Sequence, residues 1–158
     1  MNNRRGFLIA SAAVAGWLAL PGCARAVVKP AKPLNILVLG GTGFLGPHFV
    51  EAARAKGHKL TLFNRGKSNP TRFDGEEFND IEQLQGDRKS DLSALQGDRR
   101  WDAVLDTSAY FPADVSRSAG LLAKRVKQYV IISSISVYAD GSKPGADEAA
   151  EVAVMENP

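Results

Sequence analysis

The sequence predicts an α/β fold in which a parallel sheet is covered by helices on both faces. Short apolar runs of strand length, such as NILVL at residues 35–39, are typical of strands that are buried on both sides. From Leu34 onward such runs alternate with helical stretches, and this alternation indicates parallel crossover units. A chain of 158 residues has room for one core, so we expect a single domain.

The first predicted elements form a strand, a helix and a second strand. Residues 27–33, VVKPAKP, are expected to be a linker, because proline resists both helix and central strand. A strand at 35–39 leads to a helix at 44–58, with Pro47 near its start and Gly57 at its end, and KLTLFN at 59–64 forms the next strand. The helix is expected to group Leu45, Phe49, Val50 and Ala53 on one side.

The later elements continue the alternation. Strands are expected near residues 81–87, 103–106 and 127–134, and a second helix at 113–126. The predicted domain therefore covers residues 34–138, and the Gly-, Pro- and acid-rich residues 139–158 form a surface loop. A parallel sheet that stops here exposes an edge, so we expect the chain to be prone to aggregation.

The first 26 residues are typical of an export signal. Arg4 and Arg5 precede an apolar stretch from Phe7 to Leu20, which as a helix spans roughly 21 Å, short of the roughly 30 Å of a membrane core. The arginine pair resembles the twin-arginine signal, which makes the twin-arginine export machinery an expected partner and the periplasm or exterior the expected location. A general secretory signal and an uncleaved N-terminal helix are the alternative interpretations.

Two cleavage sites remain open within this signal. Residues 20–23, LPGC, resemble a lipoprotein site at which Cys23 becomes a lipid anchor, whereas residues 24–26, ARA, resemble an ordinary site that removes the cysteine. In both cases the mature domain has no cysteine for a disulfide.

The charge balance argues against nucleic acid as a partner. The chain has 20 Lys and Arg against 17 Asp and Glu, and three of the arginines lie in the first 26 residues, so the rest is balanced. His48 and His58 do not pair as metal ligands, and no metal site is expected. We expect the carboxylates of Asp102 and Asp106, at the ends of one strand, to be solvated rather than to act as an acid/base pair.

Three evenly spaced glycines follow the first strand. Gly40, Gly43 and Gly46 lie between a predicted strand and a predicted helix, where glycines permit a tight turn and close backbone approach and the helix N-terminus favours an anion. This context predicts a dinucleotide phosphate site. The alternative is that the glycines serve only a tight strand-to-helix connection.

The end of the second strand indicates which dinucleotide binds. An NAD site usually has an acid there, but this sequence has Asn64, Arg65 and Lys67, which favour the 2′-phosphate of NADP over NAD. NAD stays as the second choice, and Arg65 and Lys67 as simple solvated charges are the alternative interpretation.

Several motifs occur in the order of a known family. GGTGFLG, TLFNRGK, QGDR and VIISSISVYAD resemble the extended or atypical short-chain dehydrogenase/reductases, and more closely the NAD-dependent epimerase/dehydratase proteins. The resemblance implies a Rossmann-type doubly wound parallel sheet that binds NAD(P), here as the N-terminal portion of the family's fold.

The resemblance also implies site residues. The pyrophosphate loop would comprise Gly40, Thr42, Gly43, Phe44, Leu45 and Gly46. The ribose would lie near Asn64 and Arg65, and the adenine near Asp87 and Arg88. Thr107 and Ser108 would lie at the mouth of the fourth strand. Ser134 matches the family's catalytic Ser/Thr, and its alternative role is to cap the strand end.

One family feature is missing from the sequence. No Tyr is followed four residues later by Lys, and we expect the family's Tyr-x-x-x-Lys helix and substrate subdomain to lie beyond Pro158. Two hypotheses follow. The chain is a truncated nucleotide-sugar or related oxidoreductase/epimerase, or it is a non-catalytic nucleotide-binding module or partner subunit. Its small-molecule substrate and any homo-oligomer are left open.

Overall fold

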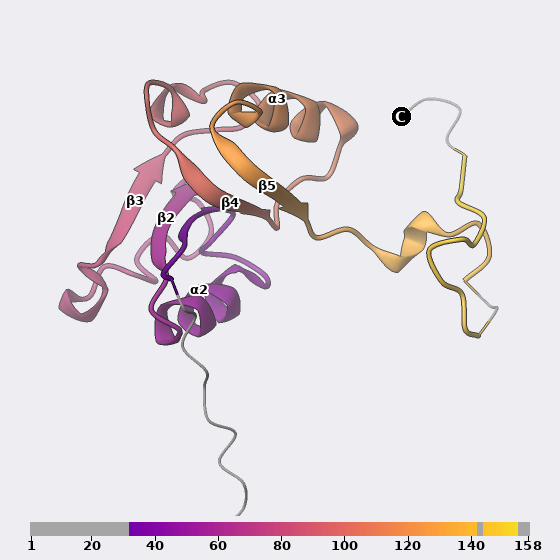
Figure 1. Cartoon of the computed structure of the whole chain (residues 1–158), viewed down its shortest axis with the longest axis horizontal. Coiled ribbons are helices and arrows are strands. Elements are labelled where there is room, and N and C mark those ends of the chain that lie inside the picture. Colours follow the sequence, from indigo (N-terminus) through magenta and orange to yellow (C-terminus); the bar gives the residue numbers. More distant parts are fainter. Residues whose placement is uncertain (1–31, 142–143, 155–158) are drawn as a thin grey trace, which may run out of the picture.

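The protein folds around one five-stranded parallel sheet. We describe a computed structural model, which defines residues 32–141 and 144–154. The strand order across the sheet is β3-β2-β1-β4-β5, as Figure 1 shows. The strands are β1 (Asn35–Leu39), β2 (Lys59–Asn64), β3 (Ile81–Gln85), β4 (Trp101–Asp106) and β5 (Val126–Ile131). The predicted parallel α/β fold is confirmed.

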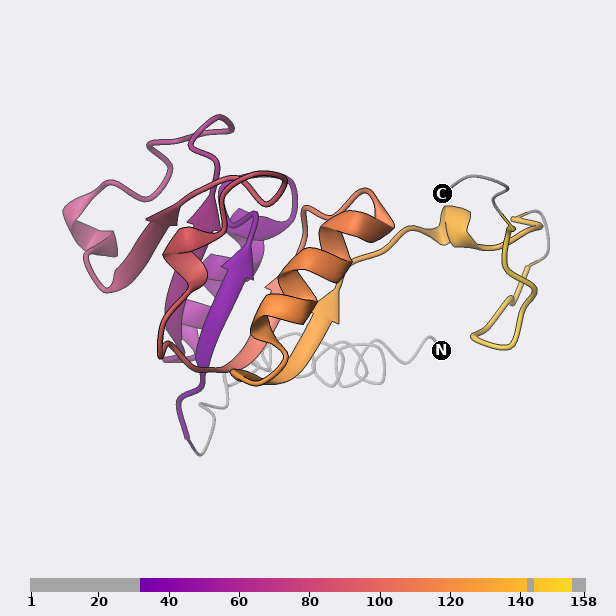
Figure 2. The same ribbon diagram turned by 90° about the horizontal axis from the view of Figure 1, so that it is seen from above.

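Helices cover the two faces of this sheet. Helix α2 (Gly46–Ala55) packs Val50 and Ala53 on β1 and β2. Helix α3 (Pro112–Leu122) and the short 3-10 helix η2 (Ser93–Leu95) lie on the opposite face, where Leu122 and Leu95 are fully buried. Figure 2 shows α3 in front of the sheet and α2 behind it. The sheet is therefore doubly wound, as predicted, with one apolar core on each side.

The register of the strands places their carboxyl ends side by side. Leu39, the last residue of β1, is paired with Phe63 of β2 and with Asp106 of β4. The chain runs outward from β1 through β2 to β3, and then crosses to β4 and β5 on the other side of β1. The strand order therefore reverses between β1 and β4. Ligands of open α/β sheets bind outside such a reversal point.

Helix α2 starts later than predicted. It begins at Gly46 and has Pro47 in its first turn, and Gly57, with a φ of +83°, follows its end. Leu45 precedes the helix and is 43% exposed, so it does not belong to the helix side that carries the buried Val50 and Ala53. The physical reason is that Leu45 belongs to the turn that leads out of the glycine loop, where the helical periodicity of buried positions has not begun.

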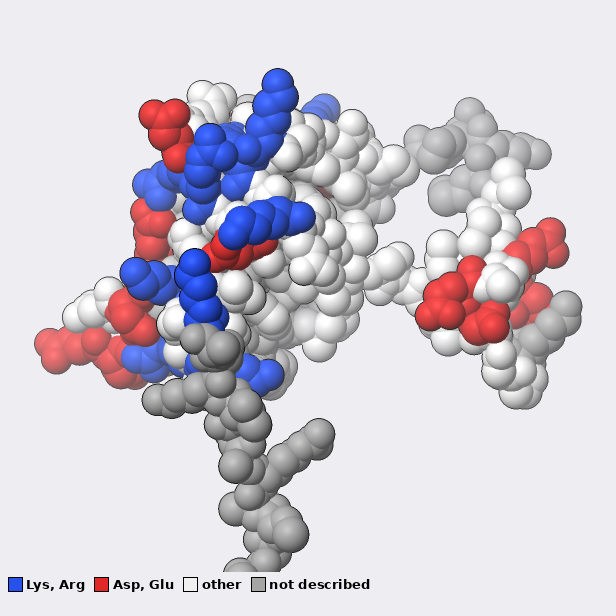
Figure 3. All heavy atoms as spheres, viewed as in Figure 1, with Lys and Arg blue, Asp and Glu red and all other residues white. Residues whose placement is uncertain are grey.

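The segment after β5 extends away from the sheet. It contains a short 3-10 helix, η3 (Ile135–Val137), and an antiparallel bridge between Tyr138 and Val152. Figures 1 and 2 show this segment reaching outward from the end of β5. Its described part carries acidic side chains, whereas the sheet domain mixes both signs of charge (Figure 3).

The export signal, its cleavage sites and most of the linker fall at residues 1–31, outside the described residues. Within the described residues, no helix has both the length and the apolar character needed to cross a membrane.

Candidate nucleotide-binding site

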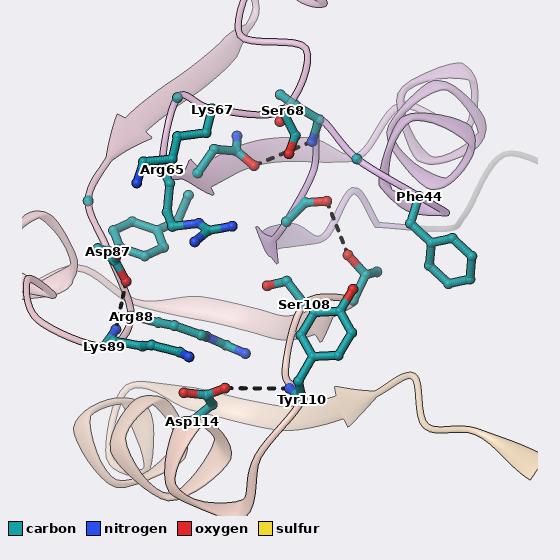
Figure 4. Close-up of a pocket in the computed structure, with 18 residues that line it drawn as sticks. Phe44, Arg65, Lys67, Ser68, Asp87, Arg88, Lys89, Ser108, Tyr110 and Asp114 are labelled. Carbon is teal, nitrogen blue, oxygen red and sulfur yellow. Dashed lines mark hydrogen bonds between the residues drawn. The ribbon is translucent and has the colours of Figure 1, made fainter. Parts of the chain in front are cut away.

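A cavity of about 390 Å³ opens at the carboxyl ends of β1, β2, β3 and β4. Its walls come from the glycine loop after β1, from residues 64–68 after β2, from residues 86–89 after β3, and from residues 107–110 after β4. The start of α3 adds Asp114. Figure 4 shows these segments surrounding a shared space. The cavity is therefore at the reversal point of the strand order.

The glycine loop has no room for side chains at two of its positions. Gly40 has a φ of +91°, and a Cβ there would lie 2.8 Å from the Cβ of Ser108. A Cβ at Gly46 would collide with the carbonyl oxygen of Gly40 and the backbone of Gly41. Thus Gly40 permits the turn and Gly46 lets the helix start pack on it, as a phosphate-binding strand-to-helix turn requires.

Gly43, the middle one of the three glycines, faces more open space. The nearest atom to a Cβ at Gly43 would be the Cβ of Ser68, at 3.7 Å. Phe44 follows with a φ of +51° and is 77% exposed. In Figure 4 its ring lies across the site from Arg65 and Lys67. Thr42, Gly43 and Phe44 line the cavity, whereas Leu45 and Gly46 do not.

Residues 64–68 form the wall opposite the glycine loop. The side-chain oxygen of Asn64 accepts a hydrogen bond from the backbone N–H of Thr42 at 3.3 Å, which joins the two walls. Arg65 and Lys67 are exposed and line the cavity, and the guanidinium of Arg65 reaches toward its centre (Figure 4). Neither is in an ion pair with a described residue. The segment thus presents positive charge and no carboxylate to a ligand.

Asp87 and Arg88 have different surroundings, although they are adjacent. Asp87 is half-buried in the cavity wall, and its Oδ1 accepts a hydrogen bond from the N–H of Lys89 at 2.9 Å. Arg88 also lines the cavity, but it is only 8% exposed, and its Nη2 is 2.7 Å from Oδ2 of Asp106. Its guanidinium is therefore engaged in a buried ion pair beneath the site.

Asp106 is fully buried, so the prediction that it is solvated is wrong. Besides Arg88, its Oδ2 accepts a hydrogen bond from the Tyr129 hydroxyl at 2.7 Å, and its Oδ1 accepts from the N–H of Ser108 at 3.1 Å. Ser118 of α3 lies 2.9 Å from the same tyrosine hydroxyl. Asp106 lies on the face of β4 that α3 covers, where water is excluded and a carboxylate needs partners.

Burial also acts on Tyr129. Desolvation is the main cause that raises its pKa to about 12, while the bond to Ser118 lowers it and the neighbouring Asp106 carboxylate raises it further. At neutral pH the hydroxyl is therefore protonated and donates to Asp106.

Thr107 and Ser108 connect β4 to the glycine loop. The Thr107 hydroxyl lies within hydrogen-bond distance of the carbonyl oxygens of Leu39 and Gly40, at 3.2 and 3.1 Å. Both residues line the cavity, as does Asp114, a buried carboxylate at the start of α3 that accepts a bond from the N–H of Tyr110 at 3.5 Å. Sequence reasoning missed Asp114, although an acid in the first turn of a helix that begins near a strand end was an available signal.

Ser134 is not among the residues that line the cavity. It is exposed and precedes η3, and its hydroxyl oxygen accepts from the N–H of Ser136 at 3.1 Å. The structure thus places Ser134 as the cap of a short helix and does not bring it together with the other predicted site residues.

No His, Cys, Asp and Glu side chains of residues 32–141 and 144–154 gather in a group that could hold a metal ion. Asp102, at the other end of β4, accepts from the N–H of Asn35 and pairs with Lys127. The Asn35 bond is the main reason that its pKa is lowered, with Lys127 second.

The fold and the cavity together define an NAD(P)-binding protein with a Rossmann-type sheet. The sequence matches the NAD dependent epimerase/dehydratase family over residues 36–157. The chain belongs to this family. No curated protein is similar enough in sequence to count as a match.

Solved structures share the fold at low sequence identity. The UDP-Glc/GlcNAc 4-epimerase of Campylobacter jejuni superimposes with a TM-score of 0.66 at 15% identity, over 77% of this chain and 43% of its own. The dTDP-glucose 4,6-dehydratase of Bacillus anthracis, in complex with NAD, gives 0.63 at 20% identity, over 78% and 45%. The enzyme WbmG of Bordetella bronchiseptica, also with NAD, gives 0.60 at 15% identity, over 81% and 46%. This chain spans less than half the length of these three proteins.

Proposed function

We propose that this chain is the NADP-binding portion of an epimerase/dehydratase-type enzyme that acts on a nucleotide sugar or a related substrate. The observation that carries the choice of NADP is the pair of exposed cations, Arg65 and Lys67, in a cavity wall that has no carboxylate. A 2′-phosphate pairs with a guanidinium in forked geometry, whereas the acid that repels it in NAD sites is missing.

The roles of the remaining residues follow from their positions. The glycine loop would hold the pyrophosphate with backbone N–H groups, Asp87 would accept from the adenine, and Thr107 and Ser108 would line the path toward the nicotinamide. NADP supplies hydride transfer when bound. Nucleotide sugars are supported as the substrate class by the epimerase and dehydratase among the similar structures.

The affinity of Arg65→Ala for the two dinucleotides tests the cofactor choice. We expect calorimetry to show NADP binding weakened about ten- to hundredfold, because a hydrogen-bonded charge pair contributes about 1.5–3 kcal/mol, and NAD binding changed less than about twofold. Arg72→Ala is the matched control, since Arg72 is an exposed arginine that pairs with Glu51 away from the cavity. Equal loss of both dinucleotides would mean that Arg65 is only a loop charge.

A non-catalytic nucleotide-binding module or partner subunit is the second candidate. One observation favours it: the Ser134 hydroxyl accepts a hydrogen bond within its own turn and lies apart from the cavity. Such a protein binds NADP but reduces none of it when UDP- or dTDP-sugars are added. Sugar-dependent reduction of bound NADP by this chain would rule the module out.

We further propose that residues 1–26 direct export, with Cys23 as a lipid anchor if the lipoprotein site is used. The twin-arginine route suits a domain that must leave the cytoplasm with its cofactor bound. With these residues fused to a periplasmic reporter, Arg4→Lys with Arg5→Lys is expected to abolish export. Unchanged export of the double variant would exclude the twin-arginine route, and labelled fatty acid on Cys23 would decide between the cleavage sites.

A further inference from the structure

Two residues at or near the glycine loop have an unusual backbone conformation. Phe44 and Asn69 are the non-glycine residues of the described chain that have a positive φ, at +51° and +43°. Side chains rarely tolerate this conformation, and it persists where surrounding contacts impose it, often at functional sites. The two strained residues therefore indicate where the fold sets backbone shape at an energetic cost.

Asn69 is under a second constraint because Pro70 follows it. A residue before proline is restricted to extended conformations by contact with the proline ring, so the backbone of Asn69 is doubly disfavoured. In this conformation the side-chain amide of Asn69 donates a hydrogen bond to the carbonyl oxygen of Thr42 at 3.2 Å. The strain is thus linked to a contact with the glycine loop, 27 residues earlier in the chain.

Thr42 is held from both of its backbone groups. Its N–H donates to Asn64 and its carbonyl accepts from Asn69, and the residue is only 5% exposed. These two groups belong to successive peptide planes. Because a trans peptide points its N–H opposite to its carbonyl, the bond from Asn69 also fixes the direction of the N–H of Gly43.

We propose that Asn69 is a positioning residue that holds the glycine loop in its pyrophosphate-binding shape. By this bond the segment 64–69, which carries Arg65 and Lys67, and the glycine loop behave as one unit. The proposal rests on the proposed dinucleotide binding. It separates two roles along one segment: Arg65 recognises the 2′-phosphate, and Asn69 supports the loop that binds the pyrophosphate.

Asn69→Gly in the full chain tests this role. Glycine adopts a positive φ without strain, so the variant keeps the backbone path and loses only the amide. Calorimetry compares ADP, which has a pyrophosphate and no 2′-phosphate, with 2′-AMP, which has the reverse. We expect ADP binding to weaken about fivefold, the value of one hydrogen bond, and 2′-AMP binding to stay within about twofold.

Hydrogen exchange in the absence of ligand gives a second readout. In Asn69→Gly the amides of residues 41–45 should exchange faster than in the parent protein. Asn79→Gly is the control, because Asn79 is exposed, follows the short 3-10 helix η1 (Glu76–Phe78) and lies outside the cavity. This variant should leave both readouts unchanged.

Unchanged ADP affinity, an equal loss of ADP and 2′-AMP, or unchanged exchange in residues 41–45 would each overturn the positioning role. If the parent protein binds neither ADP nor NADP, the proposed cofactor function fails, and the exchange experiment alone then decides whether Asn69 holds the loop.

Discussion

Arg88 illustrates how a residue in the cavity wall can act mainly on the fold. Its Nη2 pairs with Asp106 and lies 3.4 Å from Ser118, while its Nη1 is buried and has no hydrogen-bond partner among the described residues. An unsatisfied buried N–H costs about 1–3 kcal/mol, and removing one partner of a buried ion pair costs about 3–5 kcal/mol. Arg88 therefore joins β3 to β4 beneath the site, and its neighbour Asp87 is the better placed of the two to meet a ligand.

Tyr129→Phe is expected to lower the free energy of unfolding by about 1–2 kcal/mol near neutral pH, because Asp106 loses one donor and the phenol contributes a charge-assisted bond. The loss should depend on pH. The folded-state pKa of Tyr129 is raised to about 12, above the unfolded value near 10. Its contribution is therefore complete below pH 10 and is lost as the pH rises from about 10 to about 12.

Urea denaturation of both proteins at pH 8 and at pH 11 checks this prediction. The stability difference between them should shrink at the higher pH. Tyr110→Phe is the control, because Tyr110 is 82% exposed, and it should change stability at neither pH. A difference that stays constant with pH would show that the Tyr129 hydroxyl does not titrate as its burial requires.

At the residue scale, the structure brings many of the predicted site residues to one cavity. Gly40, Thr42, Gly43, Asn64, Arg65, Asp87, Thr107 and Ser108 all line the same cavity. Sequence reasoning did not find the partners of Arg88, Asp106 or Asn69, because each contacts a residue at least 18 positions away. The roles of the cavity-lining residues as cofactor ligands stay predictions, which the binding experiments above test.

At the scale of elements, the start of α2 decides the shape of the glycine loop. Gly46→Ala would press a methyl group against the carbonyl of Gly40 and the backbone of Gly41, so the helix start must move. We expect a loss of about 1–3 kcal/mol in the free energy of unfolding, as for an overpacked core position, together with weaker NADP binding. Chemical denaturation and calorimetry measure the two effects.

Gly120→Ala provides a matched change in the other helix. A Cβ at Gly120 of α3 would meet no atom within 4 Å, so alanine should raise stability by about 0.5–1 kcal/mol and leave NADP binding unaltered. If Gly46→Ala behaved like Gly120→Ala, the close approach of helix and loop would not matter for binding.

The strands were predictable from their composition, and their ends were less so. Apolar runs located β1 and β2, but the third, fourth and fifth strands start or stop a few residues from their predicted limits. Such limits depend on which neighbour each strand pairs with. Gln85, for example, is the last paired residue of β3, because its partner Asn64 is the last residue of β2.

At the scale of the whole molecule, β5 leaves one side of the sheet open. Among the described strands, only β4 pairs with it. Several apolar side chains at and after β5 are exposed, including Val130 at 37%, Ile132 at 37% and Ile135 at 77%. An open apolar edge of this kind is a site for pairing with another copy.

We expect the 158-residue chain to self-associate through this edge, and Val130→Lys with Ile132→Lys to shift it toward monomer. Val130 lies in β5, and Ile132 directly follows the end of that strand. Light scattering after size-exclusion chromatography measures the change. Val154→Lys, at an apolar residue that is 90% exposed outside the sheet, should have little effect. A monomeric parent chain would contradict the expectation.

The sequence by itself determined the fold class, the glycine loop and the charge of the second cavity wall. Each depends on residues that are close in the chain, where periodicity, turn geometry and strand composition act directly. Only the tertiary structure decided that Asp106 is buried with Arg88, that Asn69 holds Thr42, and that Ser134 lies apart from the cavity. These contacts join distant segments, and they exist because strand pairing brings the carboxyl ends of the strands to one edge of the sheet.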